Sequence, residues 1–279
     1  MTGALSSFAL EGQKKIHASF YYIKDEVTNP FYRRDPLPGE EETNVETISH
    51  ELEVTDLRDI EHLFSTDKNG FQIVKHPFPG YDLFNDNEKI RRDYYPQIET
   101  LVKEHTGASK IYLFDHTIRR RDPSVTVDHS SNRQPGLQVH IDQTPSAVTN
   151  RVRRHLGDEA DELLKGRVRL INVWRPLFDN LTDHPLGVAD FQSTRPEELI
   201  PSKLIFRNYL GETYKVRFSP EHKWYFLSNQ NSDETIFIKC YDSDKGKAQY
   251  TPHSAFINPT SPKDARYRES IEVRALVFG

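Results

Sequence analysis

Short runs in which apolar and polar residues alternate fill the second half of the chain. They predict strands, separated by turn residues, over 110–117, 137–142, 167–175, 212–218, 224–228, 234–241 and 270–278. A helical stretch over 146–164 interrupts them. Many short strands in succession are typical of a β-barrel or a double-sheet jelly roll. We therefore expect a jelly-roll, cupin-like core over residues 110–279.

The first 109 residues follow a different pattern. We expect a strand over 18–23, an exposed loop rich in Pro, Gly and charge over 29–44, a helix over 56–64 capped by Thr55, and a helix over 85–105 that ends before Gly107. The whole chain is predicted to be α+β, with one domain over residues 1–279. In it, an N-terminal extension of helices and a strand (1–109) precedes the strand-rich core with its flanking helices.

Composition narrows the functions that such a fold could serve. The net charge of −5 argues against nucleic acid and anionic membranes as main partners, because both require a basic face. No apolar run reaches the roughly 18 residues of a membrane span, and the start of the chain lacks the pattern of a signal peptide. The single cysteine, Cys240, rules out an intrachain disulfide and suits a reducing compartment. We expect a cytoplasmic protein with a small-molecule substrate, and the oligomeric state stays open.

The first candidate site is the strand segment Val139-His140-Ile141-Asp142. Residues two apart on a strand point to the same face, so the His140 imidazole and the Asp142 carboxylate would project together. Two histidines and one carboxylate form a facial triad that holds Fe(II) and leaves adjacent positions open. Taken alone, the His-x-Asp pair is a weak signal, because a chain with 12 histidines produces such pairs by chance.

The third ligand would have to come from a distant strand. His253, in Thr251-Pro252-His253, is the best candidate, since Pro252 restricts the backbone just before it. His222 and His184 are rivals, but His222 lies in a polar turn and His184 precedes a proline in a loop. The long separation between Asp142 and His253 requires an insertion between the barrel strands.

Arg268-Glu269-Ser270 adds a candidate anion site after His253. On a strand, Arg268 and Ser270 share a face, so a guanidinium fork and a hydroxyl could bind one carboxylate together. A site for the far carboxylate of 2-oxoglutarate needs such a pair. Arg274 is the alternative anchor. The competing interpretation is that Arg268 pairs with acidic neighbours on the surface, namely Glu269, Glu272 or Asp264.

In this order, His-x-Asp, a late His and Arg-x-Ser resemble the Fe(II)/2-oxoglutarate-dependent dioxygenases, whose fold is a double-stranded β-helix of the jelly-roll kind. More narrowly, the sequence is similar to the family of the cephamycin 7α-methoxylation component, to which fungal secondary-metabolite hydroxylases, desaturases and gibberellin-desaturase-like proteins also belong. The resemblance covers roughly residues 137–278. Its segments are Ile171-Asn172-Val173-Trp174-Arg175-Pro176-Leu177, 184–186, Asp190, 224–226, 239–243, 251–253 and 268–274.

The resemblance implies an oxygenase that uses Fe(II), 2-oxoglutarate and O₂. Iron would bind His140, Asp142 and His253, and the co-substrate carboxylate would bind Arg268. Such an enzyme would abstract hydrogen from an unactivated C–H bond of a small, amino-acid-like metabolite of secondary metabolism. The outcome would be hydroxylation, desaturation or oxidative C–N ring closure of the aziridine type.

Two further side chains, Asn172 and Trp174, would share the strand face that points into the barrel. There an amide could hydrogen-bond the keto acid and an indole could wall the pocket, although simple core packing explains Trp174 equally well. A substrate carboxylate could meet one of the spare arginines, which are Arg151, Arg153, Arg154 and Arg175.

Two functions of other classes stay open at this point. In a cupin-like metal dioxygenase that does not use 2-oxoglutarate, Arg268 would bind the substrate instead, and turnover would release no succinate. A non-catalytic jelly-roll helper subunit would not need to hold iron, so an intact set of His140, Asp142 and His253 counts against it.

Overall fold

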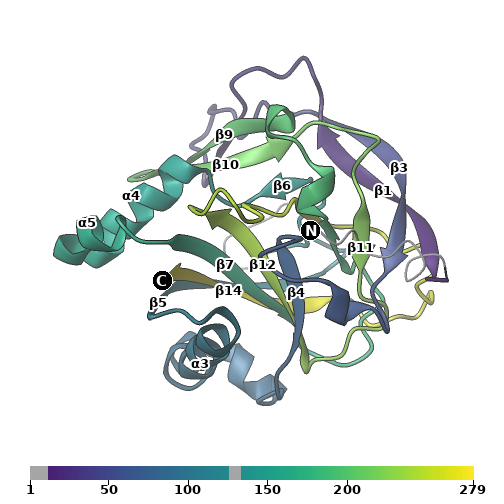
Figure 1. Cartoon of the computed structure of the whole chain (residues 1–279). Coiled ribbons are helices and arrows are strands. Elements are labelled where there is room, and N and C mark those ends of the chain that lie inside the picture. Colours follow the sequence, from purple (N-terminus) through teal and green to yellow (C-terminus); the bar gives the residue numbers. More distant parts are fainter. Residues whose placement is uncertain (1–11, 126–132) are drawn as a thin grey trace.

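The computed structural model describes residues 12–125 and 133–279, and two facing β-sheets form its core (Figure 1). The five-stranded sheet has the order β4-β12-β7-β14-β5, and the nine-stranded sheet has the order β1-β3-β11-β8-β13-β6-β10-β9-β2. The smaller sheet contains β4 (Phe71–Lys75), β5 (Lys110–Arg120), β7 (Val168–Pro176), β12 (Glu234–Asp242) and β14 (Glu269–Phe278). The larger contains β1 (Lys15–Ile23), β2 (Phe31–Arg33), β3 (Thr47–Asp56), β6 (His140–Ile141), β8 (Leu186–Ala189), β9 (Leu199–Ile205), β10 (Leu210–Val216), β11 (Trp224–Phe226) and β13 (His253–Ala255).

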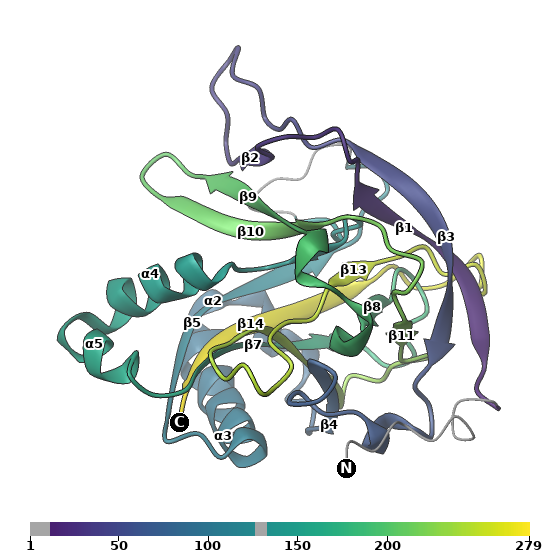
Figure 2. The ribbon, with the colours of Figure 1, turned by 45° about the horizontal axis from the view of Figure 1, so that its top comes forward.

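From β5 onward, the chain passes back and forth between the two sheets. β5, β7, β12 and β14 belong to the five-stranded sheet, whereas β6, β8, β11 and β13 belong to the other. This alternation is that of a double-stranded β-helix, or jelly roll, so the predicted fold class is confirmed. The hairpin of β9 and β10 is inserted between β8 and β11 and extends the larger sheet beyond β6 (Figure 2).

Strands from the first 109 residues complete both sheets. β1 pairs with β3 along its whole length, and β4 pairs with β12. The predicted strand over 18–23 is therefore confirmed as β1. The predicted helix over 56–64 is wrong, and only a 3-10 turn at Glu61–Leu63 forms there. β3 runs on to Asp56 because β1 on one side and β11 on the other satisfy its backbone groups.

Helices cover the outer face of the five-stranded sheet and flank one end of the barrel (Figure 1). The predicted helix over 85–105 is confirmed as α2 (Asn87–Lys89), a π-helical turn (Ile90–Tyr94) and α3 (Tyr95–Thr106), which Gly107 ends with a φ of 64°. The predicted stretch over 146–164 forms α4 (Pro145–Leu156), a 3-10 turn (Gly157–Glu159) and α5 (Ala160–Leu163). Further 3-10 turns span Tyr81–Asn85, Phe191–Ser193 and Pro196–Glu198. Among the described residues, no helix is both long and apolar enough to cross a membrane.

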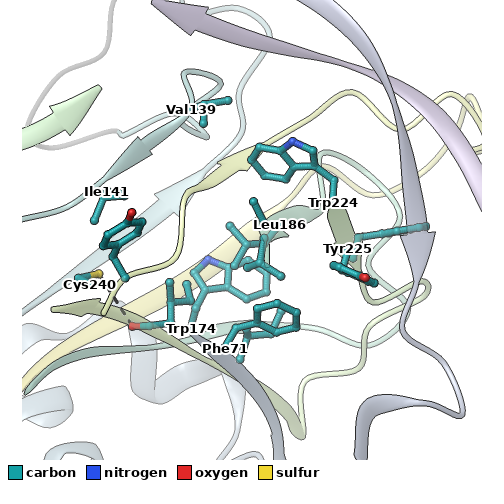
Figure 3. Packing of buried hydrophobic residues seen from close by; sticks show 14 of the residues in the cluster. Phe71, Val139, Ile141, Trp174, Leu186, Trp224, Tyr225 and Cys240 are labelled. Carbon is teal, nitrogen blue, oxygen red and sulfur yellow. Dashed lines mark hydrogen bonds between the residues drawn. The ribbon is translucent and has the colours of Figure 1, made fainter. Parts of the chain in front are cut away.

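Alternation along β14 separates two apolar layers. Ile271, Val273 and Val277 face outward and pack with α3, whereas Leu276 and Phe278 belong to the core between the sheets. In that inner core, Trp174, Leu186 and Trp224 pack together with Phe71 and Tyr225 (Figure 3). The inner layer therefore surrounds the space into which the polar face of β14 also points.

The strands predicted over 110–117, 167–175, 212–218, 224–228, 234–241 and 270–278 all form, and the one over 137–142 is reduced to β6. Six strands have no counterpart in the prediction. β8 and β13 are short and buried on both faces, so their sequences show no alternation. β2 lies inside the predicted loop over 29–44 and has only three residues.

Candidate metal centre

Three side chains converge between the two sheets. β6 and β13 are antiparallel neighbours, and this pairing places His253 directly opposite His140. Asp142 follows β6 immediately and faces both rings. Its Oδ1 atom lies 3.3 Å from His140 Nε2 and 4.0 Å from His253 Nε2. The ligand atoms of the three residues all lie within 4.8 Å of one another, a separation that one metal ion can span.

Hydrogen bonds to backbone carbonyls orient both imidazoles. His140 Nδ1 lies 2.7 Å from the carbonyl oxygen of Gln138, and His253 Nδ1 lies 3.0 Å from that of Thr251. A carbonyl can only accept, so each Nδ1 carries a proton, and in the neutral ring the lone pair is then on Nε2. The Nε2 atom of His253 is buried and has no hydrogen-bond partner. A buried acceptor left unpaired in this way fits a metal ion.

The charge states of this cluster also suit a cation. Burial, aided by the neighbouring His140, lowers the pKa of His253 to about 4, so its ring is neutral at pH 7. Burial by itself would raise the pKa of Asp142, but Arg274 and the two imidazoles hold it well below its usual range. Neutral imidazole and ionised carboxylate are the forms that bind a divalent metal. The donor set of two nitrogens and one carboxylate fits non-haem Fe(II).

Two residues from the five-stranded sheet hold the second oxygen of Asp142. Arg274 Nε donates to Oδ2 at 3.2 Å, and Asn172 Nδ2 donates to it at 2.6 Å. Arg274 also forms ion pairs with Asp115 at 3.2 Å and Glu272 at 2.8 Å. Arg274 is thus surrounded by three carboxylates. Its side chain orients Asp142, and its charge is already neutralised within the protein.

Arg268 has a different environment, although it lies on the same strand face. It is 2% exposed, its Nε donates to Ser270 Oγ at 3.2 Å, and its Nη1 donates to the carbonyl oxygen of His184 at 2.8 Å. Its guanidinium lies 4.9 Å from the centre of the Trp174 ring. Among the described residues no carboxylate forms an ion pair with this side chain. Burial, with a contribution from Arg119, lowers the pKa of Arg268 to about 9, so the group is still a cation at pH 7.

Two of the three acidic neighbours that could have paired with Arg268 on the surface, Glu269 and Glu272, bind elsewhere. Glu269 accepts hydrogen bonds from Tyr81, Arg120 and Arg266, and Glu272 pairs with Arg274. Ser270 holds the guanidinium rather than pointing away from it. Arg268 and Ser270 therefore form a buried cationic site that no carboxylate of the described residues neutralises.

The two rival histidines lie outside the cluster. Both ring nitrogens of His222 have partners, Tyr22 Oη at 3.0 Å and Glu198 Oε2 at 2.8 Å. His184 Nδ1 lies 2.8 Å from Asp183 Oδ1, and its carbonyl accepts from Arg268. Neither ring has a free nitrogen directed at Asp142, so His253 is the third member of the cluster that the structure brings together.

The spare arginines are mostly engaged away from the barrel interior. Arg175 points to the outer layer, where it donates to His76 and to the Pro77 carbonyl oxygen. Arg153 is exposed and pairs with Asp161, and Arg154 stacks on the Tyr209 ring at 4.6 Å. Arg151 lies 4.3 Å from the centre of the Phe114 ring. The expectation that one of them meets a substrate finds no support at Arg153, Arg154 or Arg175.

Lys215 is a neighbour of the cluster that the sequence pattern did not reveal. It lies on β10 directly opposite His140, and its Nζ donates to Gln138 Oε1 at 2.7 Å. Burial lowers the pKa of Lys215 to about 8, while the charge of Asp142 acts to raise it. The only signal available from the sequence was a lysine at an inward position of a strand, which is uninformative until the partner strand is known.

A cavity of about 1100 Å³ adjoins this network without containing the three converging residues. Thr117 and Arg133 line it, and Thr117 Oγ1 accepts hydrogen bonds from both Arg133 and Arg274 at 3.2 Å. Ile141, Trp174 and Cys240 belong to the apolar core between the sheets (Figure 3) and do not line this cavity.

Comparisons with known proteins place these features in a family context. A family model described as an oxidoreductase/YMDC permease-like domain matches residues 19–278. The chain is 34% identical to the Fe(II)/2-oxoglutarate-dependent dioxygenase nvfI of Aspergillus novofumigatus, over 89% of this chain and 90% of that protein. It is 37% identical to the alpha-ketoglutarate-dependent dioxygenase phiK of a fungal species, over 77% and 79%, and 34% identical to the hydroxylase/desaturase efuI of Hormonema carpetanum, over 81% and 82%. Its structure matches that of the iron and alpha-ketoglutarate-dependent endoperoxidase NvfI with a TM-score of 0.87 and 31% identity, over 95% of this chain and 98% of that chain.

Proposed function

The chain belongs to the Fe(II)/2-oxoglutarate-dependent dioxygenases that include fungal hydroxylases and desaturases, and from this premise we propose how its own residues serve the reaction. Fe(II), 2-oxoglutarate and O₂ are accordingly its cofactor and co-substrates, as the resemblance implied. The narrower likeness to the cephamycin component has no support in the comparisons. Our proposal for the metal is that His140, Asp142 and His253 hold the iron. The buried, unpaired Nε2 of His253 facing Asp142 carries this assignment.

The protein's part is to orient ligands and to keep water out. When bound together, Fe(II), 2-oxoglutarate and O₂ supply the chemistry that removes hydrogen from an unactivated C–H bond, with release of succinate and CO₂. The carbonyls of Gln138 and Thr251 keep the Nε2 lone pairs of the two imidazoles directed inward. Arg274 and Asn172 occupy Oδ2 of Asp142, which leaves Oδ1 for the metal.

For the co-substrate, we propose that Arg268 and Ser270 bind the far carboxylate of 2-oxoglutarate. The buried cation without a carboxylate partner supports this role, because an unpaired buried charge is costly and a bidentate carboxylate compensates for it. Trp174 lies against the same guanidinium and would wall the co-substrate site. Asn172 Oδ1 is buried and unpaired, so this amide could contact the co-substrate as well as Asp142.

Iron retention tests the ligand assignment. Replacing His140, Asp142 or His253 by Ala should abolish iron binding under anaerobic conditions, and with it the weak visible charge-transfer band that Fe(II) and 2-oxoglutarate produce together. His62 is exposed and lies in a 3-10 turn outside the barrel, so His62→Ala should keep both and serves as the matched control. Any one of the three variants that kept full iron and turnover would remove that residue from the ligand set.

We further propose that the substrate is a small, amino-acid-like metabolite of secondary metabolism and that the enzyme acts in the cytoplasm. The relatives' names as hydroxylases, desaturases and an endoperoxidase support small-molecule oxidation. Free amino acids, valine first, are to be tested for stimulation of succinate release. A product lighter by two hydrogens would mean desaturation or ring closure, including closure to an aziridine, and a gain of one oxygen would mean hydroxylation. Succinate release that no amino acid raises above background would contradict this substrate class.

The same assay separates the alternatives from the main proposal. A cupin-like dioxygenase that does not use 2-oxoglutarate would turn over without forming succinate, and a helper subunit would neither retain iron nor show the charge-transfer band. Membership in the dioxygenase family argues against both.

A further inference from the structure

Lys215 brings a positive charge to the side of His140 that faces away from β13. β10 pairs antiparallel with β6, and Lys215 is the direct partner of His140. Directly opposed residues on antiparallel strands point to the same face of the sheet. β10 belongs to the inserted hairpin that extends the nine-stranded sheet beyond the metal-binding strand (Figure 2). The lysine therefore reaches the site from an element outside the two sets of alternating barrel strands.

The ammonium group of Lys215 uses little of its hydrogen-bonding capacity. An ammonium has three N–H donors, and among the described residues Lys215 Nζ has one hydrogen-bond partner, the neutral Oε1 of Gln138 at 2.7 Å. Within residues 12–125 and 133–279, no carboxylate forms an ion pair with it. The Lys215 residue is half-buried between the strands. A partly desolvated cation with unused donors gains when an anion joins it.

Other buried cations of the barrel show what a completed site looks like. Lys239 contacts Asp242 at 2.6 Å and Asp67 at 2.9 Å, and Arg274 is surrounded by three carboxylates. Arg268 and Lys215 pair with no carboxylate of the described chain. The same holds for Arg175 on the outer layer, but its partners there are His76 and the Pro77 carbonyl oxygen, away from the three converging residues. The proposed function supplies an anion for Arg268, namely 2-oxoglutarate, and leaves Lys215 without one.

Asp142 does not fill this role. Its Oδ2 atom accepts from Arg274 and Asn172, its Oδ1 atom faces the two imidazoles, and Lys215 makes no ion pair with either oxygen. The second carboxylate of 2-oxoglutarate is also an unsuitable partner, because in the proposed function it binds the metal. Arg268 and Lys215 approach from different sheets, so they can serve different ligands at the same time.

We propose that Lys215 binds a carboxylate of the primary substrate and so selects acids over their neutral derivatives. This inference rests on the proposed function, and it names the residue that would bind the charged group of the substrate. A carboxylate placed at Lys215 would pair with the free N–H donors, and it would hold the rest of the substrate beside His140. Gln138 would orient the ammonium from the opposite side.

Binding to the protein loaded with Fe(II) and 2-oxoglutarate, measured anaerobically by calorimetry, tests the proposal. The probes are acetate, isovalerate, benzoate and 2-naphthoate, each paired with its neutral primary amide. We expect at least one acid to bind more tightly than its amide. Lys215→Met should weaken the binding of that acid by about 10- to 100-fold, the loss expected when a charge-assisted hydrogen bond is removed. The affinity for the amide should change by no more than about twofold. Lys215→Arg keeps a cation and should keep the preference for the acid.

The control is Lys203→Met, because Lys203 is an exposed lysine on β9 of the same hairpin. This variant should behave like the unsubstituted protein. The charge-transfer band of Fe(II) with 2-oxoglutarate distinguishes failure of the proposed function from failure of the inference about Lys215. If the unsubstituted protein lacks the band, the proposed function fails. If the band is present but Lys215→Met weakens the binding of 2-oxoglutarate more than tenfold, the lysine belongs to the co-substrate site and the inference is overturned. It is also overturned if no acid binds better than its amide.

Discussion

At the scale of single residues, the environments of two arginines on one strand face decide their roles. Arg274 is bound by Asp115, Asp142 and Glu272, and these charges, against the opposing effect of burial, raise its pKa well above the ordinary value. Arg268 has a hydroxyl and a carbonyl as partners, and burial lowers its pKa to about 9. An incoming carboxylate gains more from the cation that no carboxylate has yet neutralised. This difference supports the proposal that Arg268, and not Arg274, is the anchor for 2-oxoglutarate.

Replacing Arg268 by Ala should weaken 2-oxoglutarate binding by about 2–4 kcal/mol, the cost of removing one partner of a buried charged pair. Arg268→Lys should recover only part, because an ammonium lacks the planar fork. Titration of the anaerobic charge-transfer band with 2-oxoglutarate measures both. Arg266→Ala is the control, since Arg266 is exposed and lies two residues earlier. An unchanged requirement for 2-oxoglutarate in Arg268→Ala would move the anchor to Arg274.

At the scale of elements, the start of α4 fixes the residues that follow β6. The Thr144 hydroxyl accepts from Ala147 N at 3.2 Å as the helix N-cap, and it donates to Glu212 Oε1 on β10 at 2.6 Å. One side chain therefore joins helix α4 to the inserted hairpin two residues after Asp142. This joint limits how far β6, α4 and β10 can move relative to one another.

Thr144→Val keeps the shape of the side chain and removes these two hydrogen bonds, together with the 2.9 Å contact between Thr144 Oγ1 and Ser146 Oγ. Loss of an N-cap costs about 1 kcal/mol of folding free energy, with a range of roughly 0.5–2, and unfolding in urea measures it. Thr100→Val on the exposed side of α3 removes a hydroxyl that bonds only within its own helix, to the Pro96 carbonyl, and should change stability by less than about 0.5 kcal/mol. Equal effects of the two substitutions would show that the cap at Thr144 does not contribute.

At the scale of the whole molecule, an ion cluster links the two sheets. Arg58, just after β3 of the larger sheet, contacts Glu234 of β12 in the smaller sheet at 2.5 Å, and Lys75 of β4 contacts the same carboxylate at 3.0 Å. Burial alone would raise the pKa of Glu234, but hydrogen bonds from Arg58, from the Asn231 backbone and from Lys75 lower it to about 2. The carboxylate is thus bound more favourably in its ionised form when the protein is folded.

The direction of the pH dependence follows from this shift. The ordinary pKa of Glu234 is 4.5, so its contribution is complete above that pH and is lost as the pH falls toward 2. We expect Glu234→Gln to lower the unfolding free energy by about 1–2 kcal/mol at pH 7, a value reduced for the solvent exposure of Lys75. The difference between the two proteins should shrink between pH 4.5 and pH 2 in urea titrations of the metal-free protein. A difference that stays constant over this range would contradict the role of Glu234.

Features that depend on neighbours along the chain could be predicted from the order of residues alone. Alternation predicted β14 and β7 and which of their residues share a face, because side chains on a strand change face at every residue. His140 and Asp142 could be placed together for the same reason. Their order relative to His253 and Arg268 pointed to the family.

Only the tertiary structure decided which distant groups meet. The pairing of β6 with β13 and β10 sets His253 and Lys215 on either side of His140, and no local pattern encodes a partner strand. Residues 56–64 have helical character in isolation, yet β3 extends through Asp56 because strands on both sides satisfy its backbone. The assignment of Arg274 to Asp142 and of Arg268 to an anion likewise depends on which charges lie nearby in space. Hydrogen bonds and charge pairs act over a few ångströms, whatever the separation along the chain.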